Sequence, residues 1–454
     1  MYALLLFILF PILYGRKNRT WYFIYALLFF VIGLFIAFKL GISYAIIIHN
    51  VFYLGVLIPF MTDKVYQKYY LHAGLWLIVY AAYLFFLHAI HGNDFVRDLK
   101  DHFWILFVFI FIVEVLENIK RNRIDLSYFV KVFQIILLFE IVLCWLQYFF
   151  HDFGNFFRVT EFTWNGEAMS MSGRSDDVLD NNLCYGTLMR GSSMANFLAI
   201  SLGSLFLAKQ KKGLTQRDYI FLGIGVLTLL ITGIRAPFLV LLLMLFFVLL
   251  RGKKLSLKIV YIVAGVAIFL FVMPVLSNIG SQGSLNSLDN TVLRSLNVFT
   301  QLETGSFAEE STFTWPLSMI PYIVEHPLLG NGLHYGPGYY MALNFHVLED
   351  LSLSDAGIFF YWAEYGLIGL LIFFYFYYYI VKISPRYGFA KSDIRFLIIM
   401  LLLQSIVDCS LIDTDCTTVF ALAPIMIKYY QDKISVPVNA VRTKITKNIS
   451  LSYE

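Results

Sequence analysis

The chain has 454 residues, of which 59% are hydrophobic and only 14% are charged, and its mean hydropathy is +0.72. Soluble domains are about half apolar and about a quarter charged, so this composition excludes an ordinary soluble enzyme, a disordered chain and a disulfide scaffold. The formal net charge of +4 conceals a strong asymmetry along the chain.

Apolar segments run through most of the sequence. A membrane-spanning helix needs about 20 mostly apolar residues, which predicts an all-α, polytopic integral membrane protein with about 12–13 transmembrane helices. The first segment is short, and a signal-peptide core is the alternative; since no small-residue cleavage site follows it, we treat it as a helix with its N-terminus outside. The segments are 1–14, 21–38, 40–61, 70–91, 103–118, 128–150, 191–208, 219–233, 236–250, 259–276, 356–380, 394–407 and 417–430.

Lysine and arginine are concentrated in alternate loops. With these spans, 26 of the 34 lysines and arginines, but only seven of the 30 acids, fall in one set of loops and in the C-terminal tail. Because cytoplasmic loops carry an excess of Lys and Arg, this side and the C-terminus are predicted to be cytoplasmic. We interpret these basic loops as topology determinants rather than as a nucleic-acid or lipid-binding surface, and we expect no nucleic-acid partner.

Two polar segments are too long to be turns, and both are predicted to lie outside the cytoplasm. The resulting organisation has six parts, and within its largest loop we expect a helix near 311–325 and turns at 330–338. The parts are N-terminal helices in 1–150, an extracytoplasmic loop in 151–190, central helices in 191–276, a large extracytoplasmic loop in 277–355, C-terminal helices in 356–430 and a cytoplasmic tail in 431–454.

Three arginines on the acidic outer side need an explanation, because topology selection disfavours them there. Arg190 and Arg235 lie at predicted span ends, and Arg294 lies in the large loop. The guanidinium group binds phosphate in a bidentate manner and stays charged, and Gly191 and Gly233 leave room for a head group beside two of them. This arrangement indicates a diphosphate site, whereas the alternative is snorkelling at helix ends or pairing with outer acids.

Two acids near the eleventh span are candidates for chemistry. Asp355 lies at its outer mouth, where a desolvated carboxylate could serve as a general base; the alternative is an N-cap. Glu364 lies deeper in the span, where an ionisable group is costly and is a functional candidate by default. We expect it to contact substrate, with pairing inside the helical bundle as the alternative.

His326 and His334 lie eight residues apart in a segment rich in glycine and proline. No third ligand at metal spacing accompanies them, so we predict no metal site. His326 is a second candidate for the general base, and a hydrogen-bonded loop residue is the alternative. His334 is a candidate for substrate binding. Cys144 and Cys184 are expected to be free, buried thiols.

Four patches together resemble the O-antigen polymerase and O-antigen ligase superfamily. Residues 190–199 (RGSSMANFLA) resemble its arginine and "N-x-L-A" helix start, and residues 230–235 (LITGIR) resemble its "T-x-S-R" helix end, with Ile234 in place of serine. Residues 315–332 resemble its hydrophobic helix and "H-P-L-x-G-x-G" in the large outer loop. Residues 354–369 resemble its re-entry into the membrane, where ligases usually carry His-Asn but this chain has Asp355, as in many repeat-unit polymerases.

The resemblance implies a metal-independent membrane glycosyltransferase without cofactors. It would polymerise undecaprenyl-diphosphate-linked oligosaccharide repeat units into a surface polysaccharide, O-antigen or capsule, on the outer face of the cytoplasmic (inner) membrane. Arg190 and Arg235, with Arg294, would bind the diphosphate, and Asp355, or failing that His326, would take the proton from the acceptor hydroxyl. Membrane lipid, and a flippase and a chain-length regulator protein, would be candidates for further partners.

The sequence is also compatible with two other functions. The first is a ligase that transfers finished glycan to an acceptor, since the same superfamily contains both activities. The second is a transporter or flippase of lipid-linked sugars, although transporters often show internal repeats and none is evident here.

Overall fold

The computed structural model describes the helical framework and a few segments around it. The residues described are 19–28, 54–92, 95–150, 161–164, 167–170, 184, 186, 191–210, 213–232, 235–250, 319–332, 357–406 and 414–435. Arg190, Arg294, His334 and Asp355 lie outside them.

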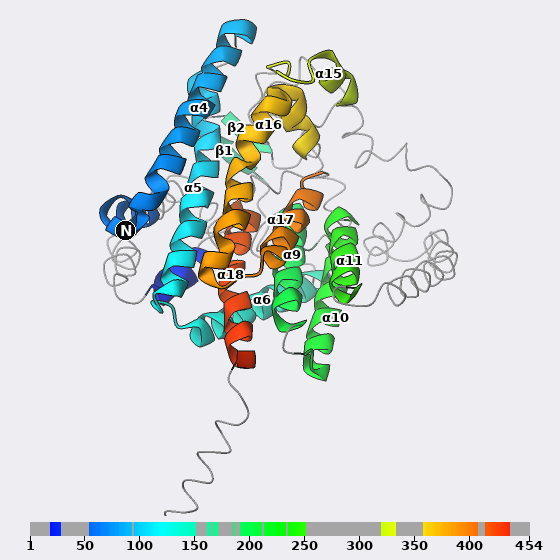
Figure 1. Ribbon diagram of the computed structural model, residues 1–454. Helices are drawn as coiled ribbons and strands as arrows, with labels where there is room; N and C mark the ends of the chain where they lie inside the picture. Colours follow the sequence, from blue (N-terminus) through cyan, green and yellow to red (C-terminus); the bar gives the residue numbers. More distant parts are fainter. Residues whose placement is uncertain are drawn as a thin grey trace, which may run out of the picture.

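Helices make up almost all of the described chain (Figure 1). Residues 20–28 and 54–62 are helical as well. The elements are η1 (Lys64–Tyr66), α4 (Gln67–His91), α5 (Phe95–Lys120), α6 (Leu126–Phe149), β1 (Glu161–Trp164), β2 (Glu167–Ser170), α9 (Gly191–Gln210), α10 (Gln216–Ile231), α11 (Arg235–Leu250), α15 (Ile320–Glu325), α16 (Gly357–Ile383), η5 (Ser384–Tyr387), α17 (Lys391–Gln404) and α18 (Thr414–Ser435).

Local sequence explains where several helices begin and end. Asp125 caps α6 by accepting a hydrogen bond from the Tyr128 amide at 2.9 Å, and Thr215 and Asp218 form a capping box at the start of α10. Gly92, in the left-handed conformation with φ 75°, ends α4. Such side-chain acceptors satisfy amides that have no partner inside the helix, and glycine takes the left-handed conformation at no steric cost.

Three helices in the described residues are long and apolar enough to cross a membrane: Lys64–His91, which includes η1, Leu126–Phe149 and Gly357–Tyr387, which includes η5. They correspond to the predicted segments 70–91, 128–150 and 356–380. One face of α4 exposes Leu71 (76%), Leu75 (54%) and Ile78 (69%), a stripe at helical spacing that suits contact with lipid rather than water. The prediction of an all-α integral membrane protein is confirmed.

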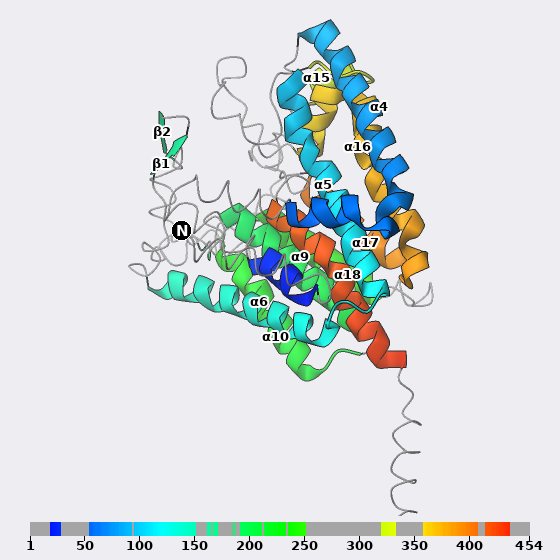
Figure 2. The ribbon, with the colours of Figure 1, turned by 90° about the vertical axis from the view of Figure 1, so that its left-hand side faces the viewer.

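A short antiparallel hairpin, β1–β2, pairs Glu161 with Ser170 and Trp164 with Glu167. The sequence did not predict it. It belongs to the predicted extracytoplasmic loop in 151–190 and lies apart from the helices in the rotated view (Figure 2).

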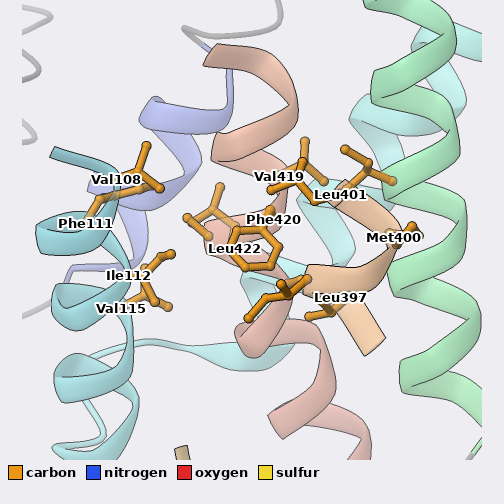
Figure 3. Close-up of a cluster of buried hydrophobic side chains, with 14 of the residues drawn as sticks. Val108, Phe111, Ile112, Val115, Leu397, Met400, Leu401, Val419, Phe420 and Leu422 are labelled. Atoms are coloured by element: carbon orange, nitrogen blue, oxygen red, sulfur yellow. The ribbon is translucent and has the colours of Figure 1, made fainter. Parts of the chain in front are cut away.

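The helices form two connected groups. Helices α4, α5 and α16 contact one another and run side by side, with α15 against α16. Helix α18 contacts α5, α6 and α9, while α17 contacts α9, α11 and α16. Figure 3 shows the resulting core, in which α5, α17 and α18 present Ile112, Leu397 and Phe420 among other apolar side chains. Cys144 and Cys184 are buried thiols, as predicted, and neither forms a disulfide within the described residues.

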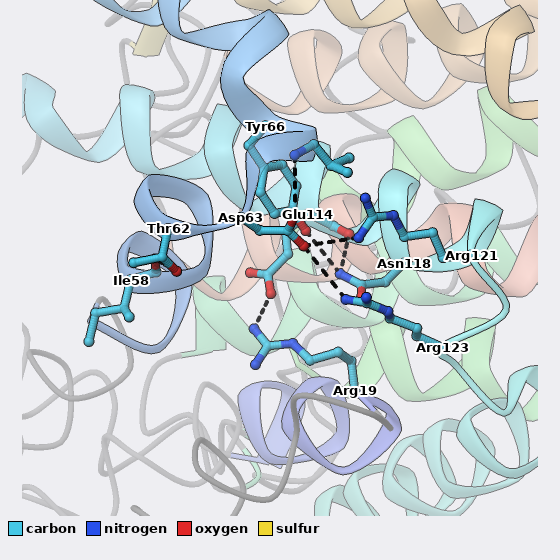
Figure 4. A network of polar contacts seen from close by, with 10 residues as sticks. Arg19, Ile58, Thr62, Asp63, Tyr66, Glu114, Asn118, Arg121 and Arg123 are labelled. Carbon is cyan, nitrogen blue, oxygen red and sulfur yellow. Dashed lines mark hydrogen bonds and ion pairs between the residues drawn. The ribbon is translucent and has the colours of Figure 1, made fainter.

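A polar network holds residue 19 and the segment before α4 against the C-terminal end of α5 (Figure 4). Arg19 forms an ion pair with Glu114 of α5, and both side chains are almost fully buried. Nearby, Asp63 pairs with Arg121 at 2.9 Å and with Arg123 at 3.8 Å. A buried charge persists only when it is paired, so this network fixes residues 19–28 against α5.

Candidate functional site

A glycine-rich turn is inserted at a break in helix α16. Gly366 has φ 64° and ψ −179°, which no helical residue adopts, so α16 consists of residues 357–365 and 367–383. The amides of Leu367 and Ile368 donate to the carbonyls of Pro327 (3.0 Å) and Leu328 (3.2 Å) in the turn after α15. The turn therefore supplies acceptors that the helix itself no longer provides.

Hydrogen bonds also run from the turn to α16. The Asn331 amide donates to the carbonyl of Ala363 at 2.8 Å, and the Gly332 amide donates to that of Glu364 at 3.0 Å. Four main-chain hydrogen bonds thus connect residues 327–332 with residues 363–368. We call this arrangement the glycine clamp.

Two glycines make the close approach possible. Gly330 (φ 75°) and Gly366 lie back to back: a β-carbon on Gly330 would collide with the backbone of Glu364 and Gly366, and one on Gly366 would collide with the backbone of Leu328. Both also have positive φ, where an L side chain is strained. Gly330 and Gly366, one from each of two sequence patches, therefore serve one structural purpose, the close approach of the turn to α16.

Side chains brace the glycine clamp from two helices. Asn331 Nδ2 donates to the carbonyls of Tyr322 (2.6 Å) and Ala363 (3.1 Å), and Trp362 Nε1 donates to that of Pro327 (2.9 Å). From α4, the Tyr83 hydroxyl donates to the carbonyl of Tyr365 at 2.6 Å and lies 3.1 Å from that of Leu329.

Beneath the clamp lies a buried polar group of residues. Glu364 is 0% exposed, and its carboxylate and that of Asp98 in α5 are within electrostatic range of the hydroxyls of Tyr80 and Tyr365. Glu364 is therefore buried, as expected if it pairs with other groups inside the helical bundle. A contact between Glu364 and the substrate stays a prediction.

His326 begins the turn on the exposed side of the clamp. Its carbonyl accepts a hydrogen bond from the Gly330 amide at 2.8 Å, and its exposed ring lies 6.1 Å, centroid to centroid, from the ring of His91 at the end of α4. The main chain of His326 thus belongs to the turn, as expected of a hydrogen-bonded loop residue, while its ring is accessible to a ligand.

Arg190 and Arg235 flank the starts of two neighbouring helices. Arg235 is the first residue of α11, and Arg190 immediately precedes α9. Short segments link α9 to α10 and α10 to α11, which makes successive helices antiparallel, so α9 and α11 run in the same direction. Because these two helices also contact each other, both begin at the same end of the framework.

Helix α17 contacts α9 and α11 on one side and α16 on the other. A β-carbon on Gly203 of α9 would meet Met400 of α17 and Leu241 of α11, so the three helices touch at this level. Arg235, the first residue of α11, lies six residues before Leu241, which is about 9 Å along the helix axis at 1.5 Å per residue. Just past the end of α17, the Ser405 carbonyl accepts a hydrogen bond from the Ile358 amide at 2.8 Å. The start of α16, two residues after Asp355 in the sequence, therefore lies beside the C-terminal end of α17.

Gly186, four residues before Arg190 in the sequence, is hydrogen-bonded to α6. Gly186 donates its amide to Gln147 Oε1 at 2.8 Å and accepts a hydrogen bond from Gln147 Nε2 at 3.0 Å. A β-carbon on Gly186 would meet both Glu140 and Met194, so there is no free space at this point. Glu140 is fully buried here.

The sequence pointed to His326 and Glu364 but missed the residues that surround them and hold the glycine clamp. Tyr83 and Tyr80 are aromatic residues in an aromatic-rich span, and nothing in their spacing sets them apart. Asn331 was contained in the quoted motif, and its role could have been inferred only from a knowledge of where the turn docks.

Comparison with known proteins identifies one relationship. Residues 220–374 match the family model described as "O-Antigen ligase". The resemblance to the O-antigen polymerase and ligase superfamily is thereby confirmed over this segment, which contains most of α10, all of α11 and α15, and the glycine clamp. No curated protein and no solved structure gave a match. The match supports a function of the O-antigen ligase or polymerase type, in an integral membrane protein that uses a lipid-linked glycan.

Proposed function

We propose that this protein is a metal-independent membrane glycosyltransferase that polymerises undecaprenyl-diphosphate-linked oligosaccharide repeat units on the outer face of the cytoplasmic membrane. The observation that carries the proposal is the family match, because its span includes Arg235, His326, Asp355 and Glu364. The product would be a surface polysaccharide such as O-antigen or capsule.

In the proposed reaction, a hydroxyl of the acceptor repeat unit attacks the anomeric carbon of the donor glycan. The new glycosidic C–O bond forms as the bond to the diphosphate breaks, and undecaprenyl diphosphate leaves with the electron pair. Asp355, or else His326, accepts the hydroxyl proton. The sugar develops oxocarbenium character in the transition state, as in other glycosyl transfers.

Arg190 and Arg235 would neutralise the charge that grows on the departing diphosphate, assisted by Arg294. Fixed charges act strongly on a transition state when they are preorganised in a dry site. The common starting end of α9 and α11 supports this role, since Arg235 begins α11 and Arg190 is the residue before α9 in the sequence. His334 and Glu364 are proposed to contact the glycan.

The proposal can be tested with purified full-length protein and a lipid-linked oligosaccharide. The protein alone should produce a ladder of longer lipid-linked glycans. Arg190→Ala and Arg235→Ala should each lower the rate by about 100-fold or more, the usual cost of removing a preorganised charge-stabilising group. Arg217→Ala, at the exposed start of α10, is the matched control and should leave the rate unchanged. Full-length product from the Arg190→Ala/Arg235→Ala protein would contradict the assignment.

Two further variants separate the roles. Arg235→Lys should restore little activity, because an ammonium group cannot bind phosphate in the same bidentate way. Asp355→Asn should be more damaging than His326→Ala if the carboxylate is the base, and the reverse order would transfer the role to His326.

A ligase is the second candidate, and the description of the matched family favours it specifically. A ligase would move a finished glycan to a different acceptor and would not lengthen carrier-linked chains. The same purified assay distinguishes the two, since only a polymerase yields the ladder.

A further inference from the structure

A cavity lies between α16 and α17, away from the glycine clamp. Its volume is about 400 Å³, within the range of ligand-binding pockets. Its lining is aromatic and aliphatic apart from three cations at one end. The lining residues are Phe374, Tyr377, Tyr378, Val381, Lys382, Lys391, Arg395, Ile398, Ile399 and Leu402.

The lining follows helical spacing on both walls. On α16, Phe374, Tyr378 and Lys382 succeed one another at intervals of four, and on α17, Lys391 and Arg395 do the same. From Lys382 to Phe374 is about 12 Å along the helix, and from Lys391 to Leu402 is about 16 Å. The hydrocarbon core of a bilayer is about 30 Å thick, so the groove is about as long as one leaflet is deep.

The three cations are gathered at the end of the groove that the charge distribution identifies as cytoplasmic. Lys382, Lys391 and Arg395 are exposed, and none of them forms an ion pair within the described part of the chain. The carboxylate nearest to them in sequence belongs to Asp393, which is fully buried, whereas its neighbours Lys391 and Arg395 are exposed on another face of α17.

The excess of Lys and Arg on the cytoplasmic side accounts for cations at this end of the helices. It does not require these cations to surround the mouth of an apolar groove. Basic pockets between transmembrane helices on the cytoplasmic side bind anionic lipid head groups. We propose that this groove is a binding site for an anionic diacyl phospholipid of the cytoplasmic leaflet. Its phosphate contacts Lys382, Lys391 and Arg395, and an acyl chain lies along the wall formed by Tyr378, Val381 and Ile399.

The test uses full-length protein in a neutral detergent and native mass spectrometry to measure retained lipid. Wild-type protein should retain phosphatidylglycerol and lose phosphatidylcholine. The variant Lys382→Gln/Lys391→Gln/Arg395→Gln should bind phosphatidylglycerol on the order of 100-fold more weakly, since each cation contributes about a fivefold factor toward an anionic head group. The matched control, Lys64→Gln/Lys131→Gln/Arg217→Gln, removes three exposed cations from the same side without touching the groove and should change binding less than threefold.

Two further arms separate the head group from the chains. Glycerol phosphate, which lacks acyl chains, should not displace the bound phosphatidylglycerol. Val381→Trp, which fills the groove but keeps all three cations, should weaken phosphatidylglycerol at least tenfold. Equal retention of phosphatidylcholine, equal losses in both triple variants, or displacement by glycerol phosphate would each overturn the proposal.

Discussion

At its break, α16 is held by the main chain of residues 327–332, whereas beyond its last turn the chain is held by the side chain of Tyr387. Tyr387 donates a hydrogen bond to Glu117 of α5, which also accepts one from Tyr69 at 2.9 Å and pairs with Lys68 at 2.5 Å. The first attachment depends on the absence of side chains at two glycines, and the second depends on charge and hydroxyl groups.

The difference between these two attachments indicates which substitutions each of them tolerates. Main-chain hydrogen bonds set a fixed distance between two segments, so the glycine clamp positions the turn at His326 rigidly against α16. The Glu117 group, together with the neighbouring Arg19–Glu114 pair, stabilises the helices only while each charge keeps its partner. We therefore expect the contacts around Glu117 and Glu114 to respond to loss of charge and the glycine clamp to respond to gain of volume.

The largest effect is expected from Arg19→Met. Glu114 would remain buried without its partner, and breaking a buried pair in this way costs about 3–5 kcal/mol. The melting temperature of the purified protein should fall strongly, and Arg19→Met/Glu114→Leu should recover most of the loss. Arg217→Met, which removes an exposed cation, is the control; a similar small change in both single variants would refute the structural role of the pair.

A smaller but still clear loss is expected from Gly366→Ala. Its backbone conformation is one that only glycine adopts readily, at a cost of about 1–3 kcal/mol for other residues, and the new methyl group would collide with the backbone of Leu328. Gly74→Ala in α4 is the matched control, because a β-carbon there meets nothing within 4 Å. It should raise stability by about 0.5–1 kcal/mol. Thermal unfolding of the two variants side by side decides the matter, and a tolerated Gly366→Ala would show that the clamp is not tight.

Asn331→Ala should cost less than Gly366→Ala. It removes the two side-chain hydrogen bonds to Tyr322 and Ala363 but leaves the four main-chain bonds in place. A net loss of about 1–2 kcal/mol is expected, visible as faster proteolysis after α15. If Asn331→Ala were as damaging as Gly366→Ala, the side chain rather than the backbone would be the main connection.

The smallest effect is expected from Asp63→Asn, and it should depend on pH. Burial raises the pKa of Asp63, but the Val65 amide and the charges of Arg121 and Arg123 outweigh this and hold the pKa below its ordinary value. A depressed pKa in the folded state means that the carboxylate stabilises the fold above the unfolded pKa of about 3.9, and that this stability is lost as the pH falls through the folded pKa.

The difference in melting temperature between wild type and Asp63→Asn should therefore be present at neutral pH and shrink as the pH approaches about 3. Its size should correspond to less than about 1 kcal/mol, as for other partly exposed pairs. A difference that grows on acidification would contradict the pairing.

Sequence alone predicted the helices well, because long apolar runs between charged loops have few other solutions. The predicted segments 191–208, 236–250 and 394–407 became α9, α11 and α17 with ends shifted by only a few residues. It did not predict the break in the segment 356–380. Gly366 is one of several glycines in apolar sequence, and only the docking of residues 327–332 forces it out of the helix.

The candidate site was predictable to the extent that its parts carry unusual residues. Arg235 and His326 stand out because of charge on the acidic side and glycine-rich surroundings. Glu114, inside the predicted span 103–118, is a residue for which a packed polar contact is expected, but its partner Arg19 could not be anticipated because the two residues are 95 positions apart. Long-range pairs of this kind follow from helix packing, which the hydrophobic pattern does not encode.

The length distribution of carrier-linked glycan in cells that lack the protein tests the central claim most directly. The account predicts that undecaprenyl diphosphate then carries single repeat units, and that Arg235→Ala in place of the wild-type protein gives the same result. Long polymer chains accumulating on the carrier lipid would contradict the account and would identify the protein as a ligase.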